Sequence, residues 1–332
     1  MEKAYTNKGV DKMYKPLWLI LLILTLLALS ACGQPTTTNK VEKVGLLVPD
    51  TINDQVWGTK GYKGMLKIQS KLNIDVFYKE GIITKEDTEI AVKEYVKNGV
   101  NLIFGHGNDY AAFFNEIADE YPDVHFICFN GDAKQENVTS LNFKAHAMGF
   151  FGGMVAGEMT KTNKVGVIAA FEWQPEVNGF FEGASYQNHD VDVEIQFVES
   201  WDDDETAINE LDKMIVEGVD VIYPAGDGYN VPVIEKIKEN GLYAIGFVSD
   251  QSDLGEATVL TSTVQHVDDL YELVAERFNN GTLESGELYF DFDDGVISMG
   301  KFSPHVDNKF KQELLLHIEE YRQTGLLPNQ TD

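Results

Sequence analysis

Apolar and polar positions follow two patterns along this chain, and the same succession of patterns occurs twice. Short β-branched runs alternate with stretches in which apolar residues have helical spacing. An offset of about 120 residues separates the copies, which is too long for a solenoid repeat. The pattern therefore predicts two lobes of the same build. The matched pairs are 43–48 with 164–169, 98–104 with 217–223, Tyr110 with Tyr229, and 126–129 with 244–247.

Each copy predicts a helix, a glycine stop and a buried strand, in that order. In the first copy, Thr84 begins the helix with Asp87 at capping-box spacing, and Gly99 ends it. In the second, a helix over about 205–216 ends at Gly218. The strand after each glycine is apolar throughout, which is typical of parallel strands covered on both faces by helices. We expect an α/β protein with two doubly wound lobes.

The pattern before residue 40 is different. Four lysines precede an apolar run at residues 17–29, which closes with the tetrapeptide LSAC at residues 29–32. A basic head, a short apolar stretch and small residues before a cleavage site are typical of a secretory signal. The run is also shorter than the ~20 residues that a membrane span needs. We expect residues 1–31 to be a lipoprotein signal peptide.

The tetrapeptide ending at Cys32 resembles the lipobox of bacterial lipoproteins. In those proteins the cysteine becomes the N-terminus and carries a diacylglyceryl group, and two acyl chains suffice for a stable anchor. Residues 32–41 are polar and small and are expected to be a flexible tether. An uncleaved anchor with a chance cysteine is the alternative, and Met13 is an alternative start.

The charge balance excludes some partners. The chain has 26 Lys+Arg against 54 Asp+Glu, a net charge of −28. Nucleic-acid binding needs clustered positive charge, so direct contact with nucleic acid is not expected. Cys128, the only other cysteine, lies in an apolar run and is predicted to be a small core residue. No Cys/His spacing typical of a metal site is present.

The carboxyl ends of the predicted strands indicate where a ligand would bind, because α/β sheets bind ligands beyond those ends. Two lobes that face each other there would form a cleft that closes on a small molecule. The segments at these ends are 49–57, 105–109, 130–132, 171–180, 225–230 and 248–253.

Two aromatic residues in these segments are candidates for holding a planar ring. Trp57 follows the first strand and begins a helix, and Phe180 is at the matching place in the second lobe. Rings from opposite lobes could sandwich a ligand. For both residues, packing in the core is the alternative.

Other residues in the segments have weaker signals. Gly226 and Asp227 lie in a loop that lets backbone N–H groups approach a ligand, although the loop lacks the Walker A pattern. His106 ends a strand and is read as a binding or structural residue. The acidic run at 201–205 could bind calcium, but acids at a helix N-terminus are the simpler reading. No G-x-S-x-G or H-E-x-x-H motif is present, so neither an enzyme nor a cofactor is expected.

Several longer strings point to a family. The mature chain resembles the basic membrane protein family, also called the PnrA-like family of substrate-binding lipoproteins. The resemblance implies a type I periplasmic-binding-protein-like fold with a hinge crossed more than once. We expect lobe 1 to comprise 42–143 and about 244–285, and lobe 2 about 144–243 and 286–332. The strings that carry the resemblance are 52–54 (IND), 137–140 (NVTS), 152–157 (GGMVAG), 161–166 (KTNKVG), 249–251 (SDQ) and 259–262 (VLTS).

The resemblance also implies site residues. Receptors of this family stack a purine between two aromatics, whose places Trp57 and Phe180 occupy, and Asp50 and Asn53 match the first acidic loop. Four positions depart from the family pattern. These departures should weaken binding of a ribose group, because each buried charged hydrogen bond is worth about 1.5–3 kcal/mol. Asn130 replaces Asp, Val248 replaces the first Asp of a pair and leaves Asp250, Gln265 replaces Lys, and Ala147 replaces Glu.

The expected function is solute binding by a lipoprotein on the extracytoplasmic face of the cell membrane. The ligand would be a small ring-containing molecule, with a purine nucleoside or derivative as the class that the resemblance implies. An ABC permease or a membrane signalling protein would be the partner. The alternative comes from the strings at 49–54, 56–64, 173–177 and 223–232, which resemble a branch of the family described as a positive regulator of genetic competence. Such a regulator would act indirectly at the membrane, with an altered or vestigial ligand site.

Overall fold

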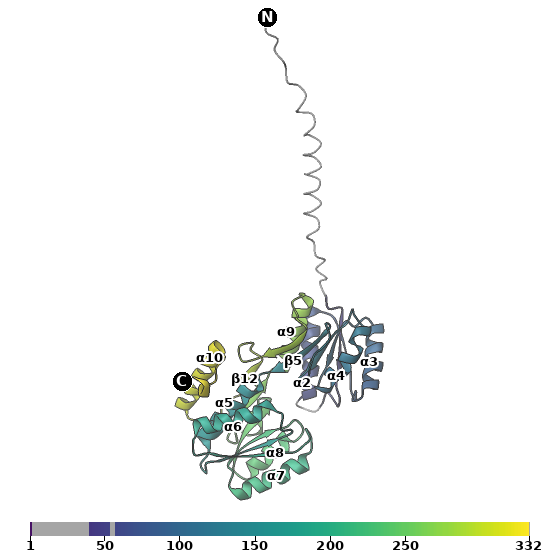
Figure 1. Ribbon diagram of the computed structural model, residues 1–332. Coiled ribbons are helices and arrows are strands. Elements are labelled where there is room, and N and C mark those ends of the chain that lie inside the picture. Colours follow the sequence, from purple (N-terminus) through teal and green to yellow (C-terminus); the bar gives the residue numbers. More distant parts are fainter. Residues whose placement is uncertain (2–39, 54–56, 332) are drawn as a thin grey trace.

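The computed structural model describes residues 1, 40–53 and 57–331 and shows two α/β lobes (Figure 1). The predicted signal peptide, the lipidation site Cys32 and most of the tether lie outside the described residues. The fold class predicted from the sequence is confirmed by the two parallel-stranded sheets. Within the described residues, no helix is long and apolar enough to span a membrane.

The sheet of lobe 1 has six parallel strands in the order β11-β5-β4-β3-β1-β2. Helices α2 and α9 pack together on one face, and α3 and α4 cover the other. The strands are β1 Lys43–Leu47, β2 Asp75–Lys79, β3 Leu102–Gly105, β4 His125–Phe129, β5 Val138–Phe143 and β11 Gly286–Phe290. The helices are α2 Trp57–Leu72, α3 Lys85–Lys97, α4 Asp109–Ile117 and α9 Val267–Asn279.

The sheet of lobe 2 repeats this order as β12-β10-β9-β8-β6-β7, with β12 antiparallel to its neighbour. Helices α5 and α6 lie on one face and α7 and α8 on the other, while α10 packs against α5. The strands are β6 Lys164–Ala169, β7 Asp192–Phe197, β8 Val221–Ala225, β9 Tyr243–Val248, β10 Val259–Gln265 and β12 Ile297–Met299. The helices are α5 Ala145–Met159, α6 Pro175–Gln187, α7 Asp204–Glu217, α8 Asn230–Glu239 and α10 Asn308–Thr324.

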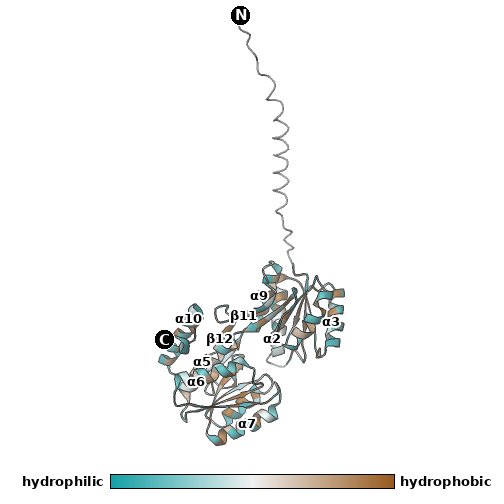
Figure 2. Cartoon of the chain, viewed as in Figure 1, coloured by the Kyte–Doolittle hydropathy of each residue, from teal (hydrophilic) through white to brown (hydrophobic). Residues whose placement is uncertain are grey.

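Local signals place the helix ends where the sequence predicts them. The Thr84 side chain accepts a hydrogen bond from the Asp87 backbone N–H at 3.1 Å. Gly218 ends α7 with a left-handed φ of 88°, a conformation that glycine adopts without strain. Figure 2 shows hydrophobic residues along the strands inside each lobe, with more hydrophilic residues on the outer helices. Cys128 is fully buried in β4, as expected.

Helices α5 and α6 approach each other unusually closely. A Cβ on Gly183 would lie 1.9 Å from the Phe150 carbonyl oxygen, and one on Gly153 would lie 2.1 Å from the Phe180 carbonyl oxygen. Only hydrogen fits at either position. This contact turns the face of α6 that carries Phe180 into the core of lobe 2.

The division into lobes differs from the predicted one. Strands β9 and β10, which we expected in lobe 1, pair with β8 and each other in the second sheet, and β11 joins the first sheet. The repeat itself matches 126–129 (β4) with 244–247 (β9), so it already assigns β9 to the second copy. The predicted boundary near residue 244 is therefore too early, and β11 lies on the other side of the hinge from its predicted lobe.

The chain crosses between the lobes three times, after β5, after β10 and between β11 and β12. Backbone hydrogen bonds join these crossings: Lys144 N–H donates to the Phe290 carbonyl at 2.9 Å, and His266 N–H donates to the Val296 carbonyl at 2.8 Å. The three crossings therefore form one hydrogen-bonded hinge.

Candidate functional site

A cleft of about 720 Å³ lies between the lobes, at the carboxyl ends of the strands. Each of the six segments named in the sequence analysis contributes at least one residue to its lining. This follows from the fold, because parallel strands of both sheets end at the same interlobe space. The volume is within the range of small-molecule sites, about 300–1,000 Å³.

Trp57 forms the wall of the cleft on the lobe 1 side. Its ring stacks on His106 with 4.4 Å between centroids and 11° between planes, and its edge meets Phe129 at 5.4 Å. The indole N–H donates to the His106 carbonyl at 3.4 Å. Because α2 begins at Trp57, the ring is fixed at the end of the helix that faces the cleft.

His106 acts as a support for that wall. It is fully buried, its Nε2 lies 2.7 Å from the Trp57 carbonyl oxygen, and its Nδ1 lies 2.8 Å from the Tyr271 hydroxyl. A carbonyl only accepts, so Nε2 carries a proton and Nδ1 can accept from Tyr271. With both ring nitrogens engaged, His106 orients the indole.

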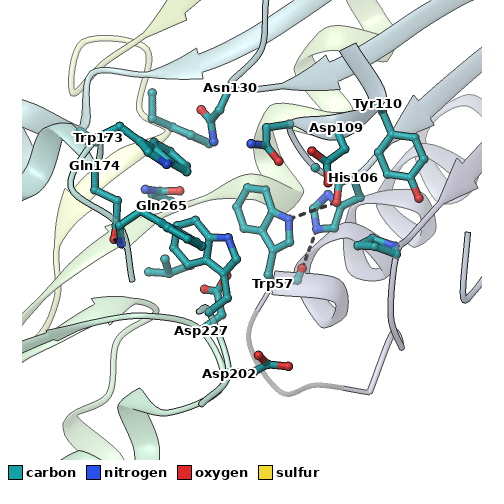
Figure 3. A pocket seen from close by; sticks show the side chains of 18 of the residues that line it. Trp57, His106, Asp109, Tyr110, Asn130, Trp173, Gln174, Asp202, Asp227 and Gln265 are labelled. Carbon is teal, nitrogen blue, oxygen red and sulfur yellow. Dashed lines mark hydrogen bonds between the residues drawn. The ribbon is translucent and has the colours of Figure 1, made fainter. Parts of the chain in front are cut away.

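The aromatic wall on the lobe 2 side comes from two loops. Phe171 and Trp173 stack with 5.6 Å between centroids, and Trp201 meets both edge-on at 5.3 and 5.8 Å. The exposed fraction of Trp173 is 54%, which leaves one of its faces to the cleft. Figure 3 shows Trp57 and Trp173 on opposite sides of the cleft.

Phe180 is not part of this wall. It is fully buried and stacks on Tyr223 with 5.3 Å between centroids, inside lobe 2. The alternative of core packing therefore describes its position. The close approach of α5 and α6 is the physical reason.

A buried polar pair lines the cleft next to the lobe 2 aromatics. Gln174 Nε2 donates to Glu176 Oε1 at 2.8 Å and to the Ala225 carbonyl at 3.1 Å, and Gln174 Oε1 accepts from the Phe171 N–H at 2.8 Å. Only 5% of Glu176 is exposed. Burial raises the pKa of its carboxyl, because desolvation disfavours the charged form.

The residues predicted from the sequence divide into two groups. Six of them line the cleft: Asp50, Trp57, His106, Asn130, Asp227 and Gln265.

The other four lie outside the lining. Asn53 is exposed and its N–H donates to the Thr51 hydroxyl, Phe180 is in the core, Gly226 packs on the Tyr229 ring, and Asp250 accepts from the Lys301 N–H at 3.0 Å.

Sequence reasoning missed several lining residues. Trp173, Gln174 and Glu176 lie in the segment 171–180, which the sequence places at the cleft, but only Phe180 of that segment is a predicted site residue. Trp201 and Asp202 lie in the acidic run that was read as a helix start, and Asp203 does cap α7. Loops have no periodicity, so the pattern could not show which of their side chains turn inward. Within the described part of the chain, no group of His, Cys, Asp and Glu side chains is arranged to hold a metal ion.

Comparisons with known proteins identify the family and agree with the fold. The family model for the PnrA-like ABC transporter substrate-binding protein matches residues 41–331. The transcriptional activator protein med of Bacillus subtilis is 58% identical over 310 residues, which are 93% of this chain and 98% of that protein. A purine-binding protein of Brucella abortus is 26% identical over 239 residues, which are 71% of this chain and 67% of that protein.

A solved structure shows the same likeness. The crystal structure of a transcriptional activator of the comK gene from Bacillus halodurans is 52% identical, with a TM-score of 0.82. The match covers 86% of this chain and 99% of that one.

Proposed function

The chain belongs to the PnrA-like family of ABC transporter substrate-binding proteins and has its type I periplasmic-binding-protein-like fold, and from this premise we propose that it is a solute receptor. Its cleft would close on a small ring-containing molecule. The observation that carries the proposal is the pair of aromatic walls, with Trp57 in lobe 1 facing Trp173 in lobe 2. Flat rings from two hinged lobes suit a planar ligand.

The ligand class is a finer proposal. A purine nucleoside or derivative is supported by the distant purine-binding relative. The neutral Asn130, Val248, Gln265 and Ala147 stand where the family has charged groups, and Asn130, Val248 and Gln265 line the cleft. This lining suits a ring-containing ligand whose binding depends less on charged hydrogen bonds to ribose.

The family supports a proposal for the location and the partner. We propose that Cys32 carries a lipid and tethers the protein to the extracytoplasmic face of the cell membrane. An ABC permease or a membrane signalling protein would bind the lobes from outside the cleft. Direct contact with nucleic acid and an enzymatic reaction are not part of this proposal.

Thermal unfolding of the fragment from Gly33 onward tests it. A ligand at a hundredfold excess over Kd should stabilise the fold by about 2.7 kcal/mol. A panel of purines and nucleosides is screened beside other ring compounds. At the same ligand concentration, the Trp57→Ala variant should keep only about a third of the shift. The Phe181→Ala variant, which removes an aromatic that is 47% exposed outside the cleft lining, should keep all of it. If no ring compound shifts the wild type, the proposal is wrong.

A second function is favoured by the 58% identity to a named transcriptional activator. We propose that the chain is a positive regulator of genetic competence that acts indirectly, from the membrane. Transformation frequency in the source bacterium tests this with a deletion strain complemented by each variant. A Cys32→Ser variant that still activates from the cytoplasm would contradict the indirect route, and full activity of Trp57→Ala would show that regulation does not need the cleft.

A further inference from the structure

Among the residues of charged type (Asp, Glu, Lys and Arg) that line the cleft, all are acids. Six carboxylate residues line it, and no Lys or Arg does among the residues that the structure describes. Both lobes contribute, so the bias belongs to the cleft as a whole. The six are Asp50, Asp109, Glu176, Glu199, Asp202 and Asp227.

Five of these acids differ from acids elsewhere in the described chain that pair with lysines. On the outer face of lobe 1, Lys67 pairs with Asp268 at 2.7 Å. In the described part of the chain, by contrast, no ion pair joins a Lys or Arg to the cleft residues Asp50, Asp109, Glu176, Glu199 or Asp202.

The nearby lysines are engaged elsewhere. Lys60 donates to the backbone carbonyl of Gln265 at 2.6 Å, and burial lowers the pKa of its ammonium to about 8. Lys144 pairs with Asp291 in the hinge at 3.3 Å. Neither lysine is among the described residues that line the cleft.

The aromatic walls add to this preference. An indole face attracts a cation by about 0.5–2 kcal/mol, and tryptophan does so better than the other aromatic side chains. Trp57, Trp173 and Trp201 all line the cleft. In Figure 3, Asp227 lies near Trp57, and Asp202 lies farther from the two indoles.

Glu176 is the most buried of the six acids, with 5% of its surface exposed. A buried carboxyl is costly to ionise when no opposite charge is near. A cation in the cleft would supply that charge, and Gln174 already holds one carboxyl oxygen by a hydrogen bond of 2.8 Å.

From the one-signed lining and the indole walls, we propose that the cleft selects ring compounds that carry a positive charge, such as protonated or N-alkylated nitrogen heterocycles. This inference rests on the proposal that the cleft binds a ring-containing solute. Beyond that proposal, the inference specifies the charge of the ligand. Phosphorylated or carboxylated ring compounds would be rejected by the same carboxylates.

Two series of probes, each with one ring system and three charge states, test this by calorimetric titration of the fragment from Gly33 onward. The first is nicotinate, nicotinamide and 1-methylnicotinamide, and the second is adenosine 5′-monophosphate, adenosine and 1-methyladenosine. In at least one series, the cationic member should bind at least tenfold more tightly than the neutral one, and the anion should not bind measurably. The preference should weaken as salt is added.

Variants connect the preference to the acids. The double change Glu199→Gln with Asp202→Asn should reduce the preference for the cation several-fold, because both side chains are exposed at the rim and line the cleft. Asp204→Asn is the matched control, since Asp204 is exposed at the start of α7 outside the lining.

The outcomes separate this inference from the proposed function. Neutral members that bind as tightly as cationic ones, or anions that bind best, would overturn the charge preference and leave ring binding intact. If ring compounds of every charge fail to bind, the proposed function fails and this inference fails with it.

Discussion

The two lobes share one strand order but present different walls to the cleft. In lobe 1 the ring of Trp57 is held by His106 through stacking and through hydrogen bonds to backbone atoms. In lobe 2, Trp173 contacts the rings of Phe171 and Trp201, and 54% of its surface is exposed. The shared topology determines where each wall stands, while local contacts determine how rigid it is.

This difference has a consequence for binding. A fixed side chain loses little conformational entropy when a ligand arrives, whereas each side chain that must be immobilised costs about 0.5–1.5 kcal/mol. We therefore expect lobe 1 to supply a preformed platform and lobe 2 an adjustable cover. The predictions below test this comparison and the packing beneath it, from the largest expected effect to the smallest.

The helix pair under the lobe 2 wall is expected to be the least tolerant of change. Gly153→Ala should lower the free energy of unfolding by about 3 kcal/mol, because the new Cβ would meet the Phe180 carbonyl at 2.1 Å and the two helices would have to separate. The measurement is chemical denaturation.

The neighbouring Gly152→Ala is the control. Its Cβ would lie 3.2 Å from the Thr263 side chain, so the change should cost less than about 1 kcal/mol. Equal losses at the two positions would show that backbone contact between α5 and α6 is not what limits this site.

Removing each wall should affect ligand binding unequally. Trp57→Ala should weaken binding of any ligand from the panel by about 2 kcal/mol, roughly 30-fold, since it removes a rigid, central ring. Trp173→Ala should weaken it by about 1 kcal/mol, because neighbouring rings can partly replace it. Titration calorimetry measures both, and a larger loss at Trp173 would reverse the roles of the two walls.

The equivalent turns after β4 and β9 differ in backbone strain. Asn130 and Val248 both have left-handed φ values, 53° and 60°. Asparagine tolerates this conformation, but a β-branched residue does not. Asn130→Val should therefore cost about 1–2 kcal/mol in unfolding free energy, whereas Asn130→Gly should be nearly neutral.

The reverse change tests the same point in lobe 2. Val248→Asn relieves strain but loses apolar burial, so its net effect should be smaller than the loss at Asn130. A large destabilisation by Val248→Asn would mean that packing, and not backbone strain, dominates this turn.

The buried carboxyl of lobe 2 should make stability depend on pH. Burial raises the pKa of Glu176 above its ordinary value of 4.5. The contribution of the neutral Glu176 carboxyl to the free energy of unfolding is therefore fully present below the pKa of the unfolded chain. It is lost as the pH rises through the pKa of the folded protein. The Glu176→Gln variant should have the same free energy of unfolding as the wild type at about pH 4 and a higher one at about pH 7. This difference should be smaller than those predicted for the variants above. Thermal unfolding at both pH values checks this, and an unchanged difference between them would argue against it.

Much of the fold could be predicted, because its signals are local or repeated. Thr84 and Gly218 bound helices by capping chemistry that a few residues contain. The repeat of strand patterns implies the common sheet order. What could not be predicted is which lobe receives β10 and β11, because strand pairing across the hinge depends on contacts between residues far apart in sequence.

The candidate site was less predictable. Of two adjacent rings, Phe180 is fully buried and Phe181 is 47% exposed, and the choice between them is made by the glycines of a different helix. Trp173 and Trp201 come together only after two separate loops fold. Trp57 was predictable, because it follows a strand and begins a helix at the edge where ligands bind.

The hinge has a consequence for how this protein would report on its cleft. Three chain crossings joined by backbone hydrogen bonds should resist sliding and twisting of one lobe against the other more than they resist bending at the hinge. The lobes are therefore left with essentially one variable, the angle between them. A partner on the outside can sense that angle without touching the ligand, so one mechanical signal would serve a permease and a signalling protein equally well.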